Sequence, residues 1–408
     1  MLPWLTRRFG RTAPPRRKST IPLVALHGPG GGFLPARQGA GLVAAGFHRN
    51  AIVYRCVRLV AEAAASISWT LLIDGREAPD HPLARLLERP NPAASGTDLF
   101  EALYGHLLLS GNGYVARIPG HAGPLALHAL RPDRLSLVPG PDGWPVAWDY
   151  AAGGTAIRFP AGPDGTGDLL HIRLFDPLND QLGFAPLAAA ETALAMHEAA
   201  HRWNKALLDN SARPSGALVY AASDSMTETQ FDRLRDELES AFQGAGNAGR
   251  PILLEGGLDW KPLSLSPRDM DFHAAQAGAA REIALAFGVP PMLLGLPGDN
   301  TYANYAEANR ALLRLTVLPM VQRMQADFAH WLQPLEGGLL RFRPDLDAIE
   351  ALAEEREALW RRVSAAPFLS DDEKREALGY GRQARPANPA RSSGPASSFN
   401  PASSSNPA

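Results

Sequence analysis

The best candidates for catalytic or metal-binding residues are His197, Glu198 and His201, which form the pattern His-Glu-Ala-Ala-His in an Ala-rich segment. On a helix, two histidines four residues apart share one face and can both bind Zn²⁺, while the glutamate can act as general base. The pattern is incomplete, because Asn204 and Leu207 stand where an extended motif would place a glycine and a third histidine. A zinc-dependent peptidase is therefore kept as an alternative and not as the first hypothesis.

Other patterns that resemble binding sites do not predict a cofactor. The run GPGGG at residues 28–32 lacks the Gly-Lys-Ser/Thr of a phosphate-binding loop and follows no evident strand, so we interpret it as linker. The single cysteine, Cys56, excludes an internal disulfide, and its helical context predicts a core position. His81, His128 and His171 lack metal-ligand spacing. We expect no metal and no cofactor.

Charge is distributed unevenly along the chain. Residues 1–61 contain ten Lys or Arg and no acid, whereas residues 62–408 carry 30 basic and 42 acidic residues. A basic arm can bind nucleic acid or an acidic partner, so a monomeric nucleic-acid-binding protein is a second alternative. The acid-free arm also resembles an organelle transit peptide. Neither a long apolar run nor an apolar secretory segment occurs, so we expect no membrane segment.

Residues 41–184 combine helix and strand patterns and predict a mixed α+β domain. An amphipathic helix leads to the strand WTLLI and a turn at Asp74 and Gly75, and a second helix is expected to begin with Thr97 as its N-cap. Short strands with turns between them follow, from GNGYVARI to DLLHIRLF.

The histidine motif lies on the next element, an Ala-rich helix predicted over residues 186–210. Arg213 and Pro214 end this helix, the strand SGALVY follows, and Thr227 opens a capping box for another helix. The strand PILLE, a Gly-Gly turn and a second strand come after it. Small side chains on the Ala-rich helix permit close packing with a neighbouring helix, within one subunit or between subunits.

A broken pair of helices occupies residues 279–332. The first must stop at Gly288, because Pro290 and Pro291 cannot continue it. A polar turn leads into the second helix, whose apolar stripe is interrupted by Pro319, where we expect a kink. Three consecutive residues suit the N-cap of the second helix: Asp299, Asn300 and Thr301.

The last part of the chain predicts an acidic helix over residues 345–363 and a short helix that begins with a capping box of Ser370 and Glu373. Residues 1–40 and 384–408 lack periodicity and are rich in Pro with Gly and Arg or with Ser, Ala and Asn. We expect both terminal segments to be disordered.

Several of these segments, in order, resemble the portal proteins of tailed double-stranded DNA phages and gene transfer agents. The most specific are EIALAFGVPPMLLG followed by NTYANYAEANRALLRLTVLPM, and the hairpin LLEGGL followed by Ser-Pro-x-Asp. The resemblance implies an α+β subunit with these regions: a basic flexible arm (1–40), a wing (41–184), a first stem helix (185–212), a clip (213–267), a second stem helix (268–289), a tunnel loop with a kinked long helix (290–344), a helical crown (345–383) and a disordered tail (384–408).

The same resemblance implies a function without catalytic residues. Such subunits form a ring, typically a dodecamer, at one vertex of a phage or gene transfer agent head, where double-stranded DNA passes through the channel. The expected partners are terminase, a head–tail adaptor and the major capsid protein, and the expected location is the virion after synthesis in the bacterial cytoplasm. The channel-facing residues implied are Asp299, Asn300, Thr301, Tyr302 and Asn304 on the tunnel loop, with Lys205 and Arg213 as a possible basic ring.

Overall fold

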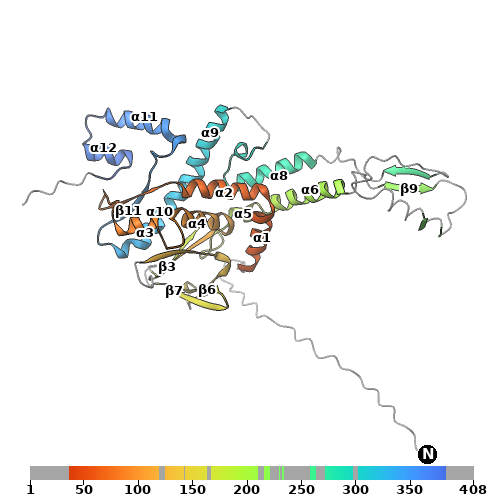
Figure 1. Ribbon diagram of the computed structural model, residues 1–408, viewed down its shortest axis with the longest axis horizontal. Coiled ribbons are helices and arrows are strands. Elements are labelled where there is room, and N and C mark those ends of the chain that lie inside the picture. Colours follow the sequence, from red (N-terminus) through yellow and green to blue (C-terminus); the bar gives the residue numbers. More distant parts are fainter. Residues whose placement is uncertain are drawn as a thin grey trace, which may run out of the picture.

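A helical body carries a long projecting arm made of two antiparallel helices (Figure 1). The computed structural model describes residues 36–118, 125–141, 143–162, 167–209, 216–220, 229, 232–233, 258–262, 272–296 and 302–382. Among these residues, no helix is both long and apolar enough to cross a lipid bilayer.

The core of the body is formed by helices whose apolar faces meet. α2 packs across α4, and α10 closes the cluster, which is completed by the ends of α6 (Glu191–Asp209) and α8 (Phe272–Ala286). Cys56 lies fully buried on α2, as its helical context predicted. The bounds of the body helices are α1 (Ala36–Arg49), α2 (Ala51–Ala65), α3 (Pro82–Glu88), α4 (Gly96–Ser110) and α10 (Leu318–Leu332), with short 3₁₀ turns at Pro132–Arg134 and Gln333–Leu335.

The N-termini of these helices follow side-chain capping rules, with one correction. The expected N-cap Thr97 lies inside α4, and the cap is Ser95, whose hydroxyl accepts from the Asp98 amide while the Asp98 carboxylate accepts from Ser95. The capping box needs an acid at the third helical position, and Asp98 provides it only if Ser95 is the cap. The helix α1 starts at Ala36, within the range predicted to be a disordered arm.

Small antiparallel sheets cover one side and the edge of this core. Asp74 and Gly75, both with positive φ, form the predicted tight turn between β1 and β2. The sheets have the strand orders β11-β1-β2, β4-β3-β8 and β5-β6-β7. Their strands are β1 (Trp69–Ile73), β2 (Arg76–Glu77), β3 (Asn112–Ile118), β4 (Ala126–Leu130), β5 (Leu135–Pro139), β6 (Pro145–Ala152), β7 (Thr155–Pro160), β8 (Leu169–Arg173) and β11 (Leu340–Pro344).

The prediction that an acidic helix begins near Asp345 is wrong, because the strand β11 ends at Pro344 and α11 begins only at Ala353. Residues Leu340–Pro344 pair with β1, with Phe342 opposite Leu71, and the acidic helix begins only later. The crown consists of a 3₁₀ turn (Glu350–Leu352), α11 (Ala353–Ser364) and α12 (Asp371–Leu378). The capping box of Ser370 and Glu373 is confirmed at the start of α12.

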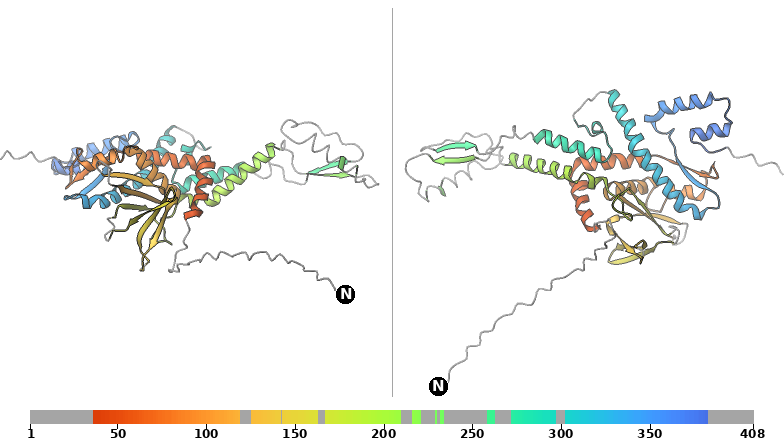
Figure 2. Two further views of the ribbon diagram at one scale, coloured as in Figure 1. Left: turned by 60° about the horizontal axis from the view of Figure 1, so that its bottom comes forward. Right: turned by 180° about the vertical axis from the view of Figure 1, so that it is seen from behind.

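The projecting arm is the antiparallel pair α6 (Glu191–Asp209) and α8 (Phe272–Ala286), which lie side by side in every view (Figures 1 and 2). The single helix predicted from residue 186 is divided at Ala190 into α5 (Pro186–Ala189) and α6. Beyond the far end of the pair lie two antiparallel paired strands, β9 (Gly216–Tyr220) and β10 (Leu258–Pro262). Of the helix predicted after Thr227, only residues 229 and 232–233 are described, and they are helical, whereas the strand PILLE lies outside the described residues.

The long helix is interrupted by a π-helical segment just before Pro319. Its parts are α9 (Tyr302–Leu312), the π segment (Leu313–Val317) and α10, and a 3₁₀ turn (Pro291–Leu294) precedes α9. The amide of Leu318 donates to the carbonyl of Leu313, five residues back. Because proline has no N–H and its ring crowds the preceding turn, the backbone widens there. A kink was expected at Pro319. The structure instead has a π-helical segment, Leu313–Val317, which ends two residues before this proline.

Candidate functional site

The base of the broken helix pair is held by a contact between Gly288 and Thr316. Gly288 ends α8 with φ of 64°, a conformation that favours glycine. The Thr316 hydroxyl, on the π segment, donates to the Gly288 carbonyl at 2.7 Å. A Cβ at Gly288 would lie 2.5 Å from Thr316 Oγ1, so only glycine fits without displacement. The contact fixes the end of α8 against the long helix.

Apolar packing holds the same base from the inside. Phe287 and Val289, on either side of Gly288, are buried in the core cluster with Val317 and Val321 of the long helix. The end of α8 is therefore held in the core against the π segment and the start of α10.

The predicted channel-facing residues lie on or before the first turn of α9. Asp299, Asn300 and Thr301 lie outside the described residues, and only the backbone of Tyr302, the first residue of α9, is described. Asn304 is exposed on this first turn, next to Tyr305, which is half exposed. The structure thus places Tyr302 and Asn304 on the first turn of α9.

Charged side chains connect α9 to the crown helix α11. Arg310 lies 3.4 Å from Glu354 and 3.9 Å from Glu355, and Arg314 lies 3.2 Å from Glu355. Arg310 also pairs with Glu307 on its own helix at 2.9 Å. The sequence did not reveal this connection, although adjacent acids in the first turn of α11 were visible.

The histidine motif lies where α6 leaves the body, and His197 is buried there. Asn50 caps α2: its Oδ1 accepts from the amides of Ile52 and Val53, so its Nδ2 must donate to His197 Nδ1, 3.0 Å away. This geometry requires a neutral imidazole with its proton on Nε2. Burial, and then the neighbouring His201, lower the pKa of His197 in agreement with that assignment.

The other two residues of the motif, Glu198 and His201, lie close to the contact between α6 and α8. His201 Nε2 lies 2.8 Å from the Gln276 amide of α8, and the His201 and His197 rings meet edge to face at 4.7 Å. Oε1 of Glu198 is buried without a hydrogen-bond partner in the described part of the chain. Within the described ranges, no three His, Cys, Asp or Glu residues are grouped to hold a metal. The two imidazoles instead tie α6 to α2 and α8.

The predicted basic ring is only partly described. Lys205 is exposed on the outer half of α6, on a different element from the channel loop, and Arg213 lies outside the described residues. Among the other predicted histidines, His81 caps α3 and lies 3.0 Å from Glu336, and His171 stacks on Tyr114. Both side chains thus take part in contacts within the body.

The fold described above is similar to that of chains in solved particle necks. A chain in the neck of an empty gene transfer agent (GTA) particle is 51% identical, with a TM-score of 0.66, over 85% of this chain and 95% of that chain. A chain in the neck of the native particle, determined with C12 symmetry, is 50% identical, with a TM-score of 0.64, over 85% and 94%.

Curated relatives agree with this match. An uncharacterized protein of Rickettsia bellii is 38% identical over 82% of this chain and 87% of its own length, and a probable portal protein of Streptomyces phage phiC31 is 28% identical over 80% and 73%. Residues 51–379 match the family described as phage portal protein, and the chain belongs to that family. The predicted portal function is thereby confirmed, and neither alternative function gains support.

Proposed function

We propose that the chain is the portal subunit of a GTA-type particle, in which twelve copies form the DNA-conducting ring at one vertex of the head. The observation that carries this proposal is the similarity, near 50% identity over 85% of the chain, to a chain in the neck of a GTA particle with C12 symmetry. The same similarity favours a GTA-type particle over a phage of another type.

We propose roles in such a ring for the parts of the subunit, and its shape supports them. The α6/α8 pair would form the stem, with the antiparallel strands β9 and β10 at its outer end (Figure 2). We propose that this outer end docks terminase during packaging and a head–tail adaptor afterwards. The α+β body lies against the major capsid protein, and the ring is assembled from subunits made in the bacterial cytoplasm.

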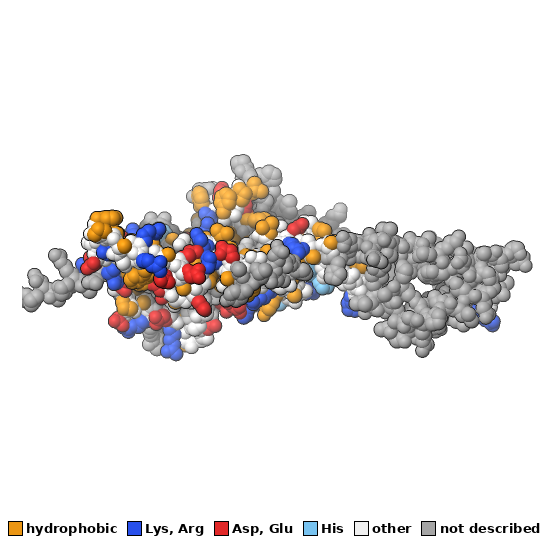
Figure 3. Space-filling model, turned by 90° about the horizontal axis from the view of Figure 1, so that it is seen from above, with side chains coloured by type: hydrophobic (Ala, Val, Ile, Leu, Met, Phe, Trp, Pro, Cys, Tyr) orange, Lys and Arg blue, Asp and Glu red, His pale blue; other side chains and the backbone are white. Residues whose placement is uncertain are grey.

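The ring has to conduct DNA without retaining it. Acidic and basic side chains are interspersed over the face of the body seen in Figure 3, and residues 62–408 carry more acids than bases. Since each neutralised phosphate strengthens binding and makes it depend on salt, a lumen lined with many cations would hold DNA too tightly to move. We propose that the subunit has no catalytic residue and that the channel is lined by Asp299, Asn300, Thr301, Tyr302 and Asn304, with Lys205 and Arg213 as a thin basic ring.

The mass and symmetry of the purified protein test the proposal. Native mass spectrometry and negative-stain imaging are expected to give rings of about twelve subunits with an open channel. A persistent monomer that binds stoichiometric zinc would instead support a peptidase. In that case Glu198→Gln should abolish activity, whereas in a portal it should leave the ring unchanged.

The loop assignment is tested separately in assembled particles. Replacing the five loop residues by alanine is expected to leave ring assembly intact and to reduce the DNA content of particles, because the change affects the lumen and not the buried base. Alanine at Thr155, an exposed residue of the β6–β7 hairpin, is the control. Normal DNA content in the loop variant would contradict the assignment.

A further inference from the structure

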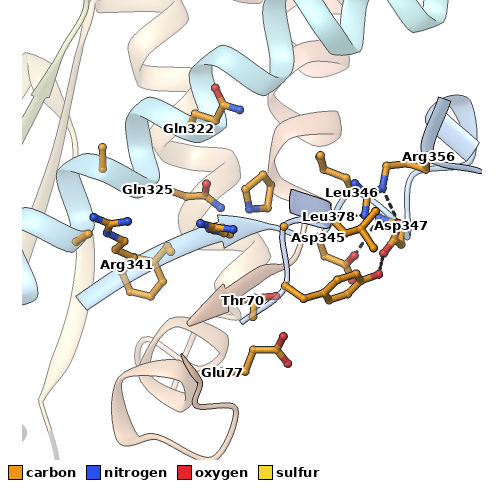
Figure 4. Close-up of a pocket in the computed structure, with 17 residues that line it drawn as sticks. Thr70, Glu77, Gln322, Gln325, Arg341, Asp345, Leu346, Asp347, Arg356 and Leu378 are labelled. Atoms are coloured by element: carbon orange, nitrogen blue, oxygen red, sulfur yellow. Dashed lines mark hydrogen bonds and ion pairs between the residues drawn. The ribbon is translucent and has the colours of Figure 1, made fainter. Parts of the chain in front are cut away.

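The acidic side chains that line the cavity between α10 and the crown already accept hydrogen bonds within the subunit. Asp347 accepts from Arg356 at 2.6 Å and from the Tyr380 hydroxyl, and Glu77 accepts from Arg375 at 3.2 Å (Figure 4). This cavity, of about 530 Å³, therefore joins the crown to the body. A different kind of surface, apolar and exposed, lies on the loop between β8 and α5.

This loop, residues 174–184, holds large apolar side chains in solvent. Phe175 is 77% exposed, Leu178 is 70% exposed and Phe184 is 44% exposed, and we call these three residues the loop patch. Exposed apolar side chains concentrated in one short segment mark an interaction site, because the subunit gains nothing from keeping them in water. Aromatic and aliphatic anchors of this kind supply most of the binding energy of protein contacts.

The backbone of the loop is fixed at its ends and within its turn. The amide of Leu174 donates to the Gly111 carbonyl at 2.9 Å, and the amide of Gly183 donates to Asn112 Oδ1 at 2.8 Å. A Cβ at Gly183 would lie 2.1 Å from the Gly111 carbonyl oxygen, so only glycine permits this approach. Inside the loop, Asn179 Oδ1 accepts from the two amides that close the turn. A fixed backbone presents the patch at a low entropic cost of binding.

The loop is acidic as well as apolar. Asp176 and Asp180 stand between the residues of the patch, and residues 174–184 include no Lys, Arg or His. A polyanion such as DNA is repelled by this surface. The fitting partner is instead a peptide segment that combines apolar and basic side chains, because complementary charge selects partners at an interface.

We propose that residues 2–9 of the same chain, which lie outside the described residues, dock on the loop patch. The segment Leu-Pro-Trp-Leu-Thr-Arg-Arg-Phe carries aromatic or aliphatic side chains at positions 2, 4, 5 and 9, with Arg7 and Arg8 among them and no acid. Its apolar side chains can cover the patch, and its two arginines match Asp176 and Asp180 of the loop.

The other terminal segment is a poorer match. Residues 384–408 contain a single aromatic residue, Phe399, and consist mainly of Pro, Ser, Ala and Asn. They offer little apolar surface to cover the loop patch.

The start of α1 is close enough to the loop for this contact. α5 follows the loop and lies beside α1 (Figure 1), where Leu187 packs against Gly46. Ala36 stands ten residues before Gly46, about 15 Å away along the helix. Phe9 is 27 residues from Ala36, and a random coil of that length spans about 30 Å. The segment can therefore reach the patch of its own subunit, where even a weak contact forms because both partners belong to one chain.

The docking does not depend on the proposed ring. Docked residues 2–9 cover the patch, while Arg16, Arg17 and Lys18 lie beyond the contact and stay available to DNA. Rings in which no docking is detected would overturn this inference and leave the portal function standing.

Photo-cross-linking in the full-length chain tests the docking. Benzoylphenylalanine in place of Trp4 is expected to cross-link to residues 174–184 of the same chain, located by mass spectrometry of the peptides. The same probe in place of Ser19, outside the docking segment, should give at most a fifth of that yield on the loop. Cross-links of the Trp4 probe to another part of the body, or to a second copy in a product of twice the subunit mass, would overturn the inference.

A cysteine on the loop gives an independent measurement. Pro177 is exposed between two residues of the patch, so Pro177→Cys places a thiol at the proposed contact. Thr155→Cys, at an exposed position of β7, is the matched control. The native Cys56 is fully buried, and burial raises the pKa of its thiol to about 12, so it contributes little background labelling.

Maleimide labelling of these cysteines is compared with and without the apolar side chains of the docking segment. Replacing Trp4, Leu5 and Phe9 by serine should make the Pro177→Cys variant react at least fivefold faster, because its thiol is no longer covered. The Thr155→Cys variant should react at one rate in both backgrounds. Equal rates for the Pro177→Cys variant would overturn the docking.

An exchange of charges tests the electrostatic match. Asp180→Arg should lower the cross-link yield of the Trp4 probe at least threefold, and Arg7→Asp combined with Arg8→Asp should restore most of it. Asp80→Arg, at an exposed acid before α3, should leave the yield unchanged. A yield that does not fall in Asp180→Arg, or that stays low after the exchange, would overturn the charge-matched contact.

Discussion

At the scale of single residues, the contact between Gly288 and Thr316 sets the most local constraint. Gly288→Ala has to place a methyl group at φ of 64° and 2.5 Å from Thr316 Oγ1. The left-handed conformation costs about 1 kcal/mol, and displacement of Thr316 adds a similar amount. We expect a loss of about 2 kcal/mol in the free energy of unfolding, measured by urea denaturation of the subunit.

The control for this change lies on the same helix. At Gly278, in the interior of α8, an added Cβ meets nothing within 4 Å, so Gly278→Ala should stabilise by about 0.5–1 kcal/mol. Thr316→Ala in the Gly288→Ala background should relieve part of the loss. A Gly288→Ala protein as stable as the parent would show that the contact does not constrain α8.

Buried histidines make the stability of the subunit depend on pH. Burial lowers the pKa of His106 to about 4 and that of His171 to about 3. In the unfolded chain both titrate near 6.5, so between pH 6.5 and about 4 the unfolded state binds more protons. Stability is therefore full above pH 6.5 and falls as the pH drops through this window.

His106→Leu isolates one of these groups. Nδ1 of His106 is buried without a partner, so leucine removes a titrating group and no hydrogen bond. At pH 5 the substitution should recover about 2 kcal/mol of the stability lost since pH 7, because each pH unit below 6.5 costs about 1.4 kcal/mol per histidine. Denaturant titrations at pH 7.5, 6 and 5 measure this slope. An unchanged slope would assign the pH dependence to other groups.

At the scale of elements, local signals predicted most helices and strands of the body, and long-range pairing explains what they missed. The turn at Asp74 and Gly75 and the capping box at Ser370 are local, and both were predicted. The strand β11 was missed because its partner β1 lies far away in the sequence, and nothing near Phe342 signals a pairing with Leu71. The N-cap of α4 was misplaced by two residues because Ser95 and Thr97 both suit a cap.

The candidate site was predictable only as a set of residues. Gly288, Pro290 and Pro291 mark the break in the sequence, but the partner of Gly288 is Thr316, 28 residues later. The histidine spacing predicted a shared helix face, which the structure has. The spacing could not predict that the side-chain amide of Asn50 would donate a hydrogen bond to His197, because the two residues lie 147 positions apart in the sequence.

The ion pairs between α9 and α11 make the attachment of the crown sensitive to salt. Arg310→Met removes the contacts with Glu354 and Glu355, and the exposed pairs contribute at most about 1 kcal/mol in total. We expect little change in global stability and faster hydrogen exchange in α11, measured by mass spectrometry. Arg361→Met, which removes a pair within α11 itself, is the control and should not change the exchange at its contact with α9. Equal exchange in both variants would show that the crown is held without Arg310.

At the scale of the whole molecule, the uneven charge predicts that DNA affinity lies in the N-terminal residues and not in the channel. Six of the ten cationic residues of the acid-free stretch precede residue 36: Arg7, Arg8, Arg11, Arg16, Arg17 and Lys18. Without them the subunit is more acidic, and it should bind duplex DNA weakly, as free passage requires.

The logarithm of the binding constant falls with the logarithm of salt concentration in proportion to the number of phosphates neutralised. Rings lacking residues 1–35 should therefore show a smaller salt slope than intact rings in fluorescence anisotropy between about 50 and 200 mM NaCl. Rings with these six residues replaced by glutamine keep the length of the segment and should match the truncated rings. If all three rings gave the same slope, the DNA would be held by the body, and a channel that releases DNA freely would no longer be tenable.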